Sequence, residues 1–453
     1  MKQTDFRAND KVLIGFIKNY CMRNFLRLHV PGHQGRCGFL NKKLAAKFDI
    51  TEVSGADWLF DSCGVLANLE HKLKLLFGSS AAISTCGSTL CVQAMVALCR
   101  NKTFIAHRSS AHVSFFNACA LLKVKVVWFG CDDDFGLNFF DLNEIEINLA
   151  KHEIGSCAVY LTSPDYFGVQ APLEQILKVC RKFRALCLVD CAHGAHLNFV
   201  KKGSHPAFLG VDLCCSSLHK TLPALTGAAV LNFNEKLFSK ARVKAAMSVF
   251  STTSPSYLIM ASIDFCVDWL KKHGNYGFLK LLDSKKNLIQ ALNLPFLKTD
   301  VSKLVIDCRK INLTGFQLAE VLRVKKIEPE FADENFVVMV LSPFLRRSDW
   351  RRLRLCLSKV KFNFVPFKQV KIKKTSRFLA NGDFINRLNL ITEIKDRQIV
   401  AVNLNEKAVG RIVSKHKFKS PPGTLMVAAG ERLTHSMVLK LQNFGETKIE
   451  VLD

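Results

Sequence analysis

The sequence predicts an α/β fold built on a mostly parallel sheet. Short apolar runs typical of buried strands alternate with segments of helical periodicity between residues 104 and 233. Strands that alternate with helices form parallel sheets with right-handed crossovers and with helices on both faces. In addition, polar residues directly follow two of the apolar runs, at Asp190 and near Lys220. Ligands bind at this carboxyl end of the strands in open α/β sheets.

The expected elements follow from apolar spacing and from residues that break regular structure. A helix is expected over 64–78, because leucines recur at helical spacing and Gly78 can end it. A second helix begins near Gly87. Strands and helices then alternate as FIAH (104–107), a helix through 115–122, VKVVWFG (124–130), CAVYLTSP (157–164), a helix over 172–184 with Pro172 in its first turn, ALCLVD (185–190), DLCCSS (212–217) and AAVLNF (228–233).

Three regions are expected along the chain. Residues 1–290 form a major domain with an N-terminal arm, in which PGHQG (31–35) breaks any regular element. Residues 291–378 form a smaller α/β domain, and residues 379–453 form a C-terminal appendage. The smaller domain is expected to contain a β-α-β set, made of KLVIDC (303–308), a helix from Thr314 with Gln317 as its capping-box partner, and FVVMVL (336–341).

Composition limits the class of protein. The chain has 453 residues, of which 49% are hydrophobic and 23% charged, as is typical of a globular protein of two or three domains. Charges interrupt the N-terminal apolar segment, and no run approaches the length of a membrane span, so neither a signal peptide nor a membrane partner is expected. The 17 cysteines include no CxxC pair and often lie in apolar runs. This pattern favours reduced thiols in a cytoplasmic protein over a metal site, and no metal is expected.

The formal net charge of +26 is concentrated in one stretch. Residues 346–377 carry many lysines and arginines with interleaved aromatics, and no acid occurs between Asp349 and Asp383. A basic stretch of this kind can bind nucleic acid or a membrane surface. The alternative is a solvated helix face that continues into a linker, and on that interpretation nucleic acid is not a partner.

Lys220 and Asp190 together indicate a cofactor. A lone lysine is most often a solvated surface charge, but Lys220 follows a histidine at the end of an apolar run, and Asp190 ends another such run. Pyridoxal phosphate needs an amine that forms a Schiff base with its aldehyde. It also needs a carboxylate that keeps its pyridine nitrogen protonated. The two residues therefore suggest pyridoxal phosphate.

A phosphate site is expected where the second helix begins. Gly87, Ser88 and Thr89 stand where the apolar period starts, so their amides and hydroxyls face outward from a helix N-terminus. Helix capping without any ligand is the commoner use of such residues, and both interpretations stay open from this segment alone.

Eight motifs in order resemble one family, the fold-type I, pyridoxal-phosphate-dependent ornithine/lysine/arginine decarboxylases, in a compact form without an N-terminal wing domain. The likeness covers nearly the whole chain. The motifs are PGHQG (31–35), DITE (49–52), GST (87–89), TSPDYFG (162–168), VDCAHGAH (189–196), SLHKTLPALT (217–226), TTSPSY (252–257) and SPPGTLMVAAGE (420–431).

The resemblance implies a set of site residues. Lys220 would form the Schiff base, Asp190 would pair with the pyridine nitrogen, and His112 would stack on the ring. Further cofactor-binding residues would be Ser88, Thr89, Ser217 and His219 at the phosphate, Ala192 and His193 beside the ring, and Ser254 and Ser256 from a neighbouring subunit. A site completed by a neighbour implies a homodimer or a larger homo-oligomer.

Three positions depart from the family's pattern. Cys191 stands where a glutamate is usual, Ser109 and Ser110 stand in place of an Arg-Asn pair, and Asp165 replaces a commoner threonine. None of these departures removes the lysine or its aspartate.

The implied activity is decarboxylation of lysine, arginine or ornithine to cadaverine, agmatine or putrescine. Lys220 or His219 would return a proton to the α-carbon, and Glu330 or Asp57 would bind the distal cation, although both acids could equally be surface carboxylates. Two alternatives remain open. One is another fold-type I reaction, such as transamination or sulfur transfer. The other is a catalytically silent relative that binds nucleic acid through residues 346–377.

Overall fold

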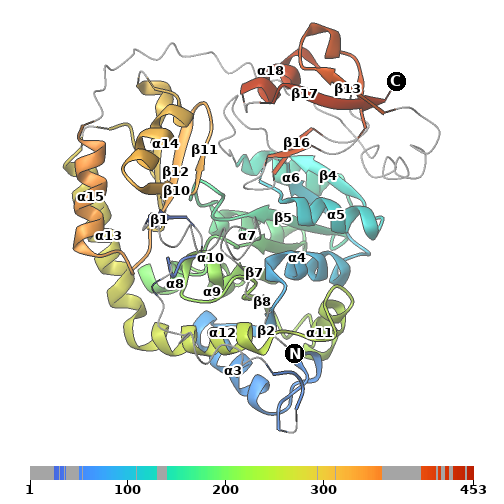
Figure 1. The fold of residues 1–453 in the computed structure, drawn as a ribbon. Helices are drawn as coiled ribbons and strands as arrows, with labels where there is room; N and C mark the ends of the chain where they lie inside the picture. The colour runs from blue at the N-terminus through green and yellow to red at the C-terminus, as the bar shows by residue number, and fades with distance from the viewer. Residues whose placement is uncertain are drawn as a thin grey trace, which may run out of the picture.

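The structure is a computed structural model, and its layers agree with the expected α/β architecture (Figure 1). It describes residues 25–29, 31–34, 36, 50–53, 55–108, 110–129, 140–292, 294–311, 313–359, 399–414, 417–419, 424–427, 432–443 and 446–452. Within these residues, no helix combines the length and the apolar character that crossing a membrane requires.

A seven-stranded sheet forms the centre of the major domain. Its order is β2-β8-β7-β6-β5-β3-β4. The strands are β2 (Ser80–Ser84), β3 (Thr103–His107), β4 (Val126–Phe129), β5 (Cys157–Thr162), β6 (Leu186–Asp190), β7 (Leu213–Ser217) and β8 (Ala229–Phe233). The pairs from β4 through β7 are parallel, whereas β8 runs antiparallel to both β7 and β2. The mostly parallel sheet is confirmed, with one reversed strand that the sequence did not reveal.

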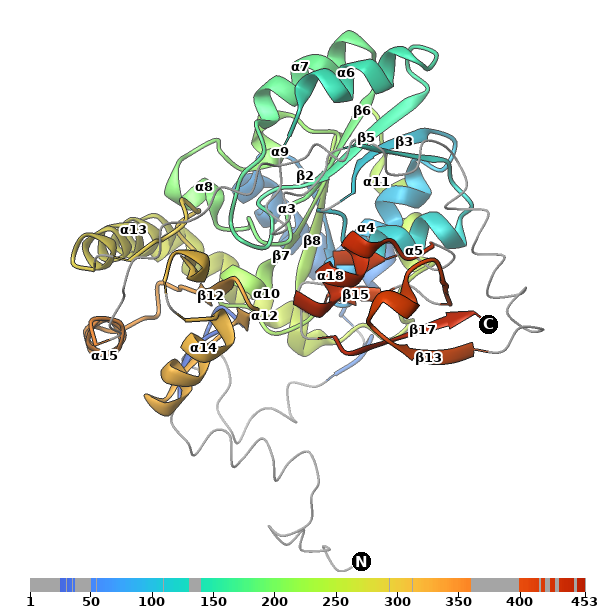
Figure 2. The same cartoon turned by 90° about the horizontal axis from the view of Figure 1, so that it is seen from above.

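Helices cover both faces of this sheet (Figures 1 and 2). Alternate residues of each strand point to opposite faces, so Phe104 packs in the cluster under α4, α5 and α11, while Ile105 packs in the cluster under α6 and α7. The helices of this domain are α3 (Val65–Phe77), α4 (Gly87–Leu98), α5 (Val113–Leu121), α6 (Leu142–Ala150), α7 (Leu173–Lys182), α8 (Leu197–Val200), α9 (Pro206–Leu209), α10 (Leu218–Thr221), α11 (Lys240–Ser248), α12 (Tyr257–Trp269) and α13 (Asn275–Gln290). Gly78 ends α3 in the left-handed conformation, as expected.

The smaller domain contains the elements of the expected β-α-β set in an antiparallel sheet. Its sheet has the order β11-β12-β9 and is antiparallel, with β9 (Lys303–Asp307), β11 (Phe331–Ala332) and β12 (Phe336–Val340). The helix α14 (Gly315–Val324) begins with the predicted capping box of Thr314 and Gln317. Two short strands, β10 (Ile327–Pro329) and β11, intervene before β12. The three expected members, β9, α14 and β12, are present, and β9 and β12 pair antiparallel. The domain continues into α15 (Arg347–Leu357).

The N-terminal arm connects the two domains. Its strand β1 (Leu26–Leu28) pairs in parallel with β10 of the smaller domain. The backbone N–H of Gly32 donates to the carbonyl oxygen of His219 at 2.8 Å, and the Ser342 hydroxyl donates to the Gly32 carbonyl at 2.5 Å. Arg36 forms an ion pair with Asp349 at the start of α15. The arm is therefore fixed between the segment that carries Lys220 and the smaller domain.

The C-terminal region has its own sheets and core. It contains β13 (Ile399–Asn403), β14 (Ile412–Val413), β15 (Lys417–Lys419), β16 (Thr424–Val427), α18 (His435–Asn443) and β17 (Lys448–Leu452). Buried residues such as Leu404, Val413 and Leu441 form a separate hydrophobic cluster there. The basic stretch begins as α15, which buries Leu353 and Leu357 and exposes its arginines. Residues 360–377 of that stretch lie outside the described residues.

Candidate active site

Lys220 lies on a short helix at the carboxyl end of β7. The helix α10 begins directly after Ser217, and the backbone N–H of Leu218 donates to the Ala228 carbonyl at 3.0 Å. The side chain of Lys220 is partly exposed, and its Nζ lies 3.1 Å from His193 Nε2. Burial lowers the pKa of Lys220 below its ordinary value, against the charge of Asp190, which raises it. A lowered pKa increases the share of neutral, nucleophilic amine.

Asp190 ends the neighbouring strand β6 and is buried. Its carboxylate accepts hydrogen bonds from three groups: the Ala192 backbone N–H at 3.0 Å, the Tyr160 hydroxyl at 3.3 Å and the Cys215 thiol at 3.4 Å. Burial and the charge of Asp190 raise the pKa of Cys215, so this thiol stays a neutral donor. The donors fix the carboxylate at the same sheet edge as Lys220, as the sequence predicts.

The N-terminus of α4 lies beside β7. Ser217 donates its hydroxyl hydrogen bond to the Ser88 hydroxyl at 2.9 Å, and Thr89 is exposed in the first turn. The preceding residue, Cys86, provides no side-chain cap for the helix. Uncapped amide groups and hydroxyls at a helix N-terminus form a suitable site for a phosphate.

The backbone at Gly227 packs closely against the start of α4. A Cβ atom at Gly227 would lie only 2.6 Å from the Thr85 carbonyl oxygen, and Gly227 has φ of +99°. The backbone N–H of Gly87 donates to the Gly227 carbonyl at 2.8 Å. A side chain at Gly227 would therefore push the start of α4 away from the Lys220 segment.

His112 and His219 make different hydrogen bonds. His112 caps α5 by accepting the Ser114 backbone N–H at its Nδ1, at 3.2 Å. His219 donates from Nδ1 to the Ala228 carbonyl at 3.1 Å, and burial lowers its pKa to about 4. His219 therefore carries its proton on Nδ1 and is a poor acid at neutral pH.

His193 is buried directly beside Lys220. Burial, followed by the charges of Lys220 and Lys303, holds the pKa of His193 well below its ordinary value. Its Nδ1 has no hydrogen-bond partner among the described residues. His193 is thus a neutral ring that can accept a hydrogen bond from the amine of Lys220.

Two residues that the sequence did not reveal complete this cluster. The ring of Tyr166 lies 5.4 Å from that of His193, at right angles, and its hydroxyl donates to Glu330 Oε1 at 3.2 Å. Lys303 Nζ lies 5.0 Å from the centre of the Tyr166 ring. The structure therefore brings Glu330 to the cluster and adds Lys303, which the sequence presented only as the first residue of a strand.

Asp57 has another use in the structure. Its carboxylate accepts backbone N–H groups of Gly64 and Leu66 at 2.8 Å each, and so caps the start of α3. These bonds outweigh the cost of burial and lower the pKa of Asp57. The structure gives Asp57 this capping role in place of the expected contact with substrate, because its acceptor sites are taken.

Ser254 and Ser256 are not joined to the Lys220 cluster within the chain. Ser256 caps α12 by accepting the Ile259 backbone N–H at 3.4 Å, and Ser254 is exposed. Because it is exposed, Ser254 is accessible to a second subunit. The resemblance implies that it contributes to the cofactor site of that subunit.

Of the family departures, Asp165 lies close to the cluster. Asp165 is buried, accepts the Val169 backbone N–H at 2.8 Å, and its charge acts on Lys303. Thr162 donates its hydroxyl to the Ser110 carbonyl at 2.5 Å, whereas Ser109 lies outside the described residues.

Cys191 belongs to a buried group with His205 and Cys214. Their ligand atoms lie within 4.8 Å of one another. His205 Nδ1, however, accepts the Ala207 backbone N–H at 3.2 Å, and its Nε2 lies 3.0 Å from the Ser216 hydroxyl. Both ring nitrogens of His205 thus already have hydrogen-bond partners within the protein.

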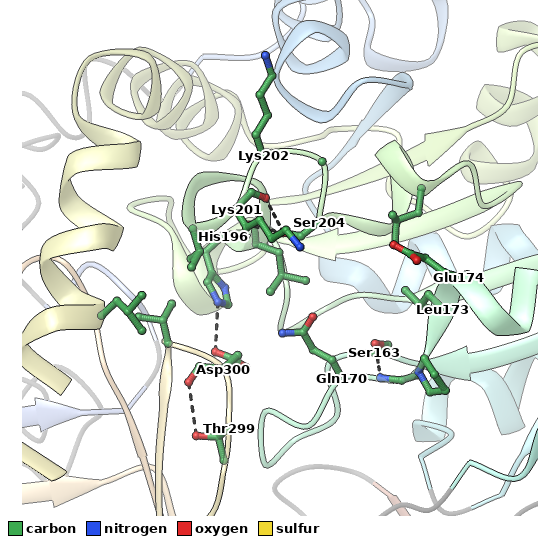
Figure 3. Close-up of a pocket in the computed structure, with 18 of the residues that line it drawn as sticks. Ser163, Gln170, Leu173, Glu174, His196, Lys201, Lys202, Ser204, Thr299 and Asp300 are labelled. Atoms are coloured by element: carbon green, nitrogen blue, oxygen red, sulfur yellow. Dashed lines mark hydrogen bonds and ion pairs between the residues drawn. The ribbon is translucent and has the colours of Figure 1, made fainter. Parts of the chain in front are cut away.

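A groove of about 600 Å³, lined by both polar and apolar side chains, lies between the 163–175 and 196–204 segments and residues 299–301 (Figure 3). His196 pairs there with Asp300, with Nε2 and Oδ1 3.2 Å apart. Neither Lys220 nor Asp190 lines this groove, whose other walls include Ser163, Gln170, Glu174, Lys201, Lys202, Ser204 and Thr299.

The fold and this cluster define a class of protein, the fold-type I pyridoxal-phosphate enzymes. The chain belongs to the Orn/Lys/Arg decarboxylase family, because the model of that family's major domain matches residues 13–294, more than half of its length. It is accordingly a pyridoxal-phosphate-dependent decarboxylase.

Individual relatives align with nearly the whole chain. The chain is 27% identical to the uncharacterized protein YaaO of Bacillus subtilis (strain 168), covering 95% of this chain and 94% of that protein. It is 24% identical to an arginine decarboxylase of the same strain, over 93% and 91% of the two chains. Among solved structures, the lysine decarboxylase LdcF of Francisella novicida superposes with a TM-score of 0.70 at 16% identity, over 93% of this chain and 78% of that one.

Proposed function

We propose that this protein decarboxylates a basic amino acid, lysine, arginine or ornithine, to the corresponding amine and CO2. The observation that carries the proposal is that Lys220 and Asp190 lie together at the carboxyl ends of adjacent strands. The family supports the reaction class, and the relatives named above include arginine and lysine decarboxylases.

The residues present fit pyridoxal phosphate. Lys220 would hold the aldehyde carbon covalently. Asp190, already fixed by three donors, would accept a hydrogen bond from the protonated pyridine nitrogen. His112, Ala192 and His193 would flank the ring. The phosphate would bind at the uncapped start of α4, through Ser88, Thr89 and Ser217. When bound, the cofactor supplies the ring that takes up the electron pair left by loss of CO2.

Side chains of the protein would bind the substrate and transfer the proton. The distal cation of the substrate would meet Glu330, which Tyr166 orients through its hydroxyl. Lys220 is the better candidate to return a proton to the α-carbon, because the pKa of His219 is lowered to about 4 and its proton is committed to the Ala228 carbonyl. The buried position of His193 keeps an uncharged ring beside the amine of Lys220.

The direct test is the visible absorbance of the purified protein, followed by product analysis with each basic amino acid. Lys220→Ala is expected to abolish both the absorbance band and CO2 release, while Lys202→Ala, at an exposed lysine, keeps both. Release of a keto acid without CO2 would instead indicate transamination. Salt-sensitive RNA binding without cofactor uptake would indicate a silent relative.

Asp190→Asn tests the second half of the site. Removing the charge while keeping the size is expected to lower turnover about 10²-fold or more, as loss of a preorganised charged group does. Asp212→Asn is the matched control, because Asp212 is equally buried but pairs with Arg181 at 3.2 Å. Asp212→Asn is expected to reduce stability and to leave turnover per folded molecule unchanged. Equal turnover in Asp190→Asn and wild type would contradict the assignment.

We also propose a cytoplasmic homodimer whose active sites are completed by the 252–257 loop of the partner. The exposed Ser254 supports this arrangement, and every cysteine that the structure describes is a free thiol. Mixing Lys220→Ala chains with Ser254→Asp chains is expected to restore part of the activity that each lacks alone, because a hybrid dimer contains one intact site. Hybrid dimers that form, as native mass spectrometry would show, yet stay inactive would rule out shared sites.

A further inference from the structure

Lys303 stands apart from the other buried lysines of the described chain. Lys244 donates to the Leu59 carbonyl at 2.8 Å and pairs with Glu70 at 3.0 Å. Lys285 donates to both the carbonyl and the hydroxyl of Thr299, at 3.2 and 2.9 Å. Lys303 is fully buried, yet its Nζ has no hydrogen-bond partner among the residues that the structure describes.

This amine belongs to the same cluster as Lys220. Its Nζ lies 5.0 Å from the Tyr166 ring, that ring lies 5.4 Å from His193, and His193 Nε2 lies 3.1 Å from Lys220 Nζ. Gly168 packs closely against the stem of Lys303, because a Cβ atom at Gly168 would lie only 2.7 Å from its Cγ. The smaller domain thus presents this amine to the site of the major domain.

None of the nearby carboxylates of the described chain accepts a hydrogen bond from this amine. Glu330 accepts the Tyr166 hydroxyl, and Asp165 accepts the Val169 backbone N–H. Asp300 Oδ1 accepts the backbone N–H and the hydroxyl of Ser302, at 2.6 and 2.7 Å. Their charges act on Lys303, but burial dominates and lowers its pKa. An amine buried without a partner costs several kcal/mol in general, unless a ligand of opposite charge completes it.

We propose that Lys303 Nζ receives the α-carboxylate of the incoming amino acid, an inference that rests on the proposed function. Lysine, arginine and ornithine each carry one carboxylate, and their product amines carry none. The bond from the α-carbon to the carboxylate carbon breaks, its electron pair stays with the α-carbon, and the carboxylate leaves as neutral CO2. Lys303 therefore loses its counter-charge in the chemical step, so the site holds the product amine less tightly than the substrate.

The test compares ligands that differ only by the carboxylate. Calorimetric titration of the full-length, cofactor-free chain with arginine and agmatine, and with lysine and cadaverine, gives an affinity ratio for each pair without turnover. Lys303→Met is expected to lower the preference for the amino acid by about tenfold to a hundredfold, the range for a hydrogen bond to a charged group. Lys303→Arg is expected to keep most of the preference.

The controls separate binding from folding. Lys244→Met removes a buried lysine elsewhere and is expected to leave the affinity ratio unchanged while lowering the melting temperature. Lys303→Met removes an unpaired amine and is expected to leave the melting temperature equal or higher. Lys303→Gln serves as a second neutral variant if Lys303→Met does not fold. In the cofactor-loaded enzyme, Lys303→Met should raise KM for the amino acid and leave the inhibition constant of the product amine unchanged.

The outcomes distinguish the two proposals. A ratio unchanged in Lys303→Met, or an equal loss of affinity for amino acid and amine, overturns the role of Lys303, whatever the enzyme's activity. A ratio that falls in a protein that releases no CO2 supports a carboxylate site at Lys303 and refutes the proposed decarboxylation. Release of CO2 together with a fallen ratio supports both.

Discussion

Burial acts on several lysines of this chain, and its consequence depends on what each amine meets. Lys285 meets three oxygen acceptors, Lys244 meets a carboxylate, and Lys303 meets none among the described residues. Hydrogen bonds and ion pairs offset the cost of burying the first two amines, whereas no hydrogen bond within the described residues does so for Lys303.

Lys285 makes stability depend on pH. Burial lowers its pKa from the ordinary 10.5 to about 8. Between those values the unfolded chain binds more protons than the folded one, so this group's contribution to stability rises as pH increases from about 8 to 10.5. The gain is at most about 3 kcal/mol. Denaturant unfolding at several pH values should show wild type gaining on Lys285→Met across this window, and parallel curves for the two proteins would contradict it.

Single residues differ in how far the sequence reveals them. Lys220 and Asp190 were predictable, because each follows an apolar run at a strand's carboxyl end. Lys303 begins an apolar run, so the sequence presented it as an ordinary strand start. The capping role of Asp57 depends on the path of residues 57–67, which no local pattern specifies.

Between elements, a buried ion pair joins α11 to α3. Lys244 on α11 pairs with Glu70 on α3 at 3.0 Å and also donates to the Leu59 carbonyl at 2.8 Å. The side chain of Glu70 is only 3% exposed, and Lys240 pairs with it from the same helix. The pair holds α11 against α3 on the side of the sheet near β2.

Lys244→Met is expected to reduce stability by up to about 3 kcal/mol, because it leaves the buried Glu70 carboxylate with only Lys240 and the Ser62 hydroxyl as partners. Changing both groups, in Lys244→Met with Glu70→Leu, should recover much of the loss, since no uncompensated charge remains. The shift of the denaturant midpoint measures both effects. A double variant less stable than the single one would show that packing, not charge, dominates here.

Most elements were predictable and their pairing was not. The helices α3 and α7 begin and end within a few residues of their expected bounds, and α14 begins at its predicted cap, because caps and apolar spacing mark them. The strand β2 was missed, because SAAIS is short, contains Ile83 as its single β-branched residue and is followed closely by α4. The antiparallel direction of β8 depends on long-range pairing that strand patterns do not encode.

Across the whole molecule, the N-terminal arm couples the domains at one crowded residue. A Cβ atom at Gly32 would lie 2.8 Å from the Thr221 carbonyl carbon and 3.1 Å from the Leu222 nitrogen, both in the backbone beside Lys220. Gly32 also bonds to His219 and Ser342, one from each domain. Any side chain there must displace either the arm or the Lys220 segment.

Gly32→Ala is therefore expected to cost about 1–3 kcal/mol of stability and to reduce turnover as well. Ser342→Ala removes one hydrogen bond from the same contact without adding bulk, so it should cost about 0.5–1.5 kcal/mol and leave turnover nearly unchanged. Melting curves and steady-state rates of the two variants provide the comparison. Full activity in Gly32→Ala would show that the arm does not position Lys220.

The contacts of the arm can form only late during synthesis of the chain. Arg36 meets Asp349 across a separation of 313 residues, and β1 pairs with β10 across a similar distance. Ribosomes add about 5–20 residues per second, so the start of the chain waits roughly 15–60 s before its partners emerge. The seven-stranded sheet ends at Phe233 and can assemble first. The nascent protein thus acquires its central layers early, and its arm can dock beside the Lys220 segment only after β10 and α15 have been synthesised.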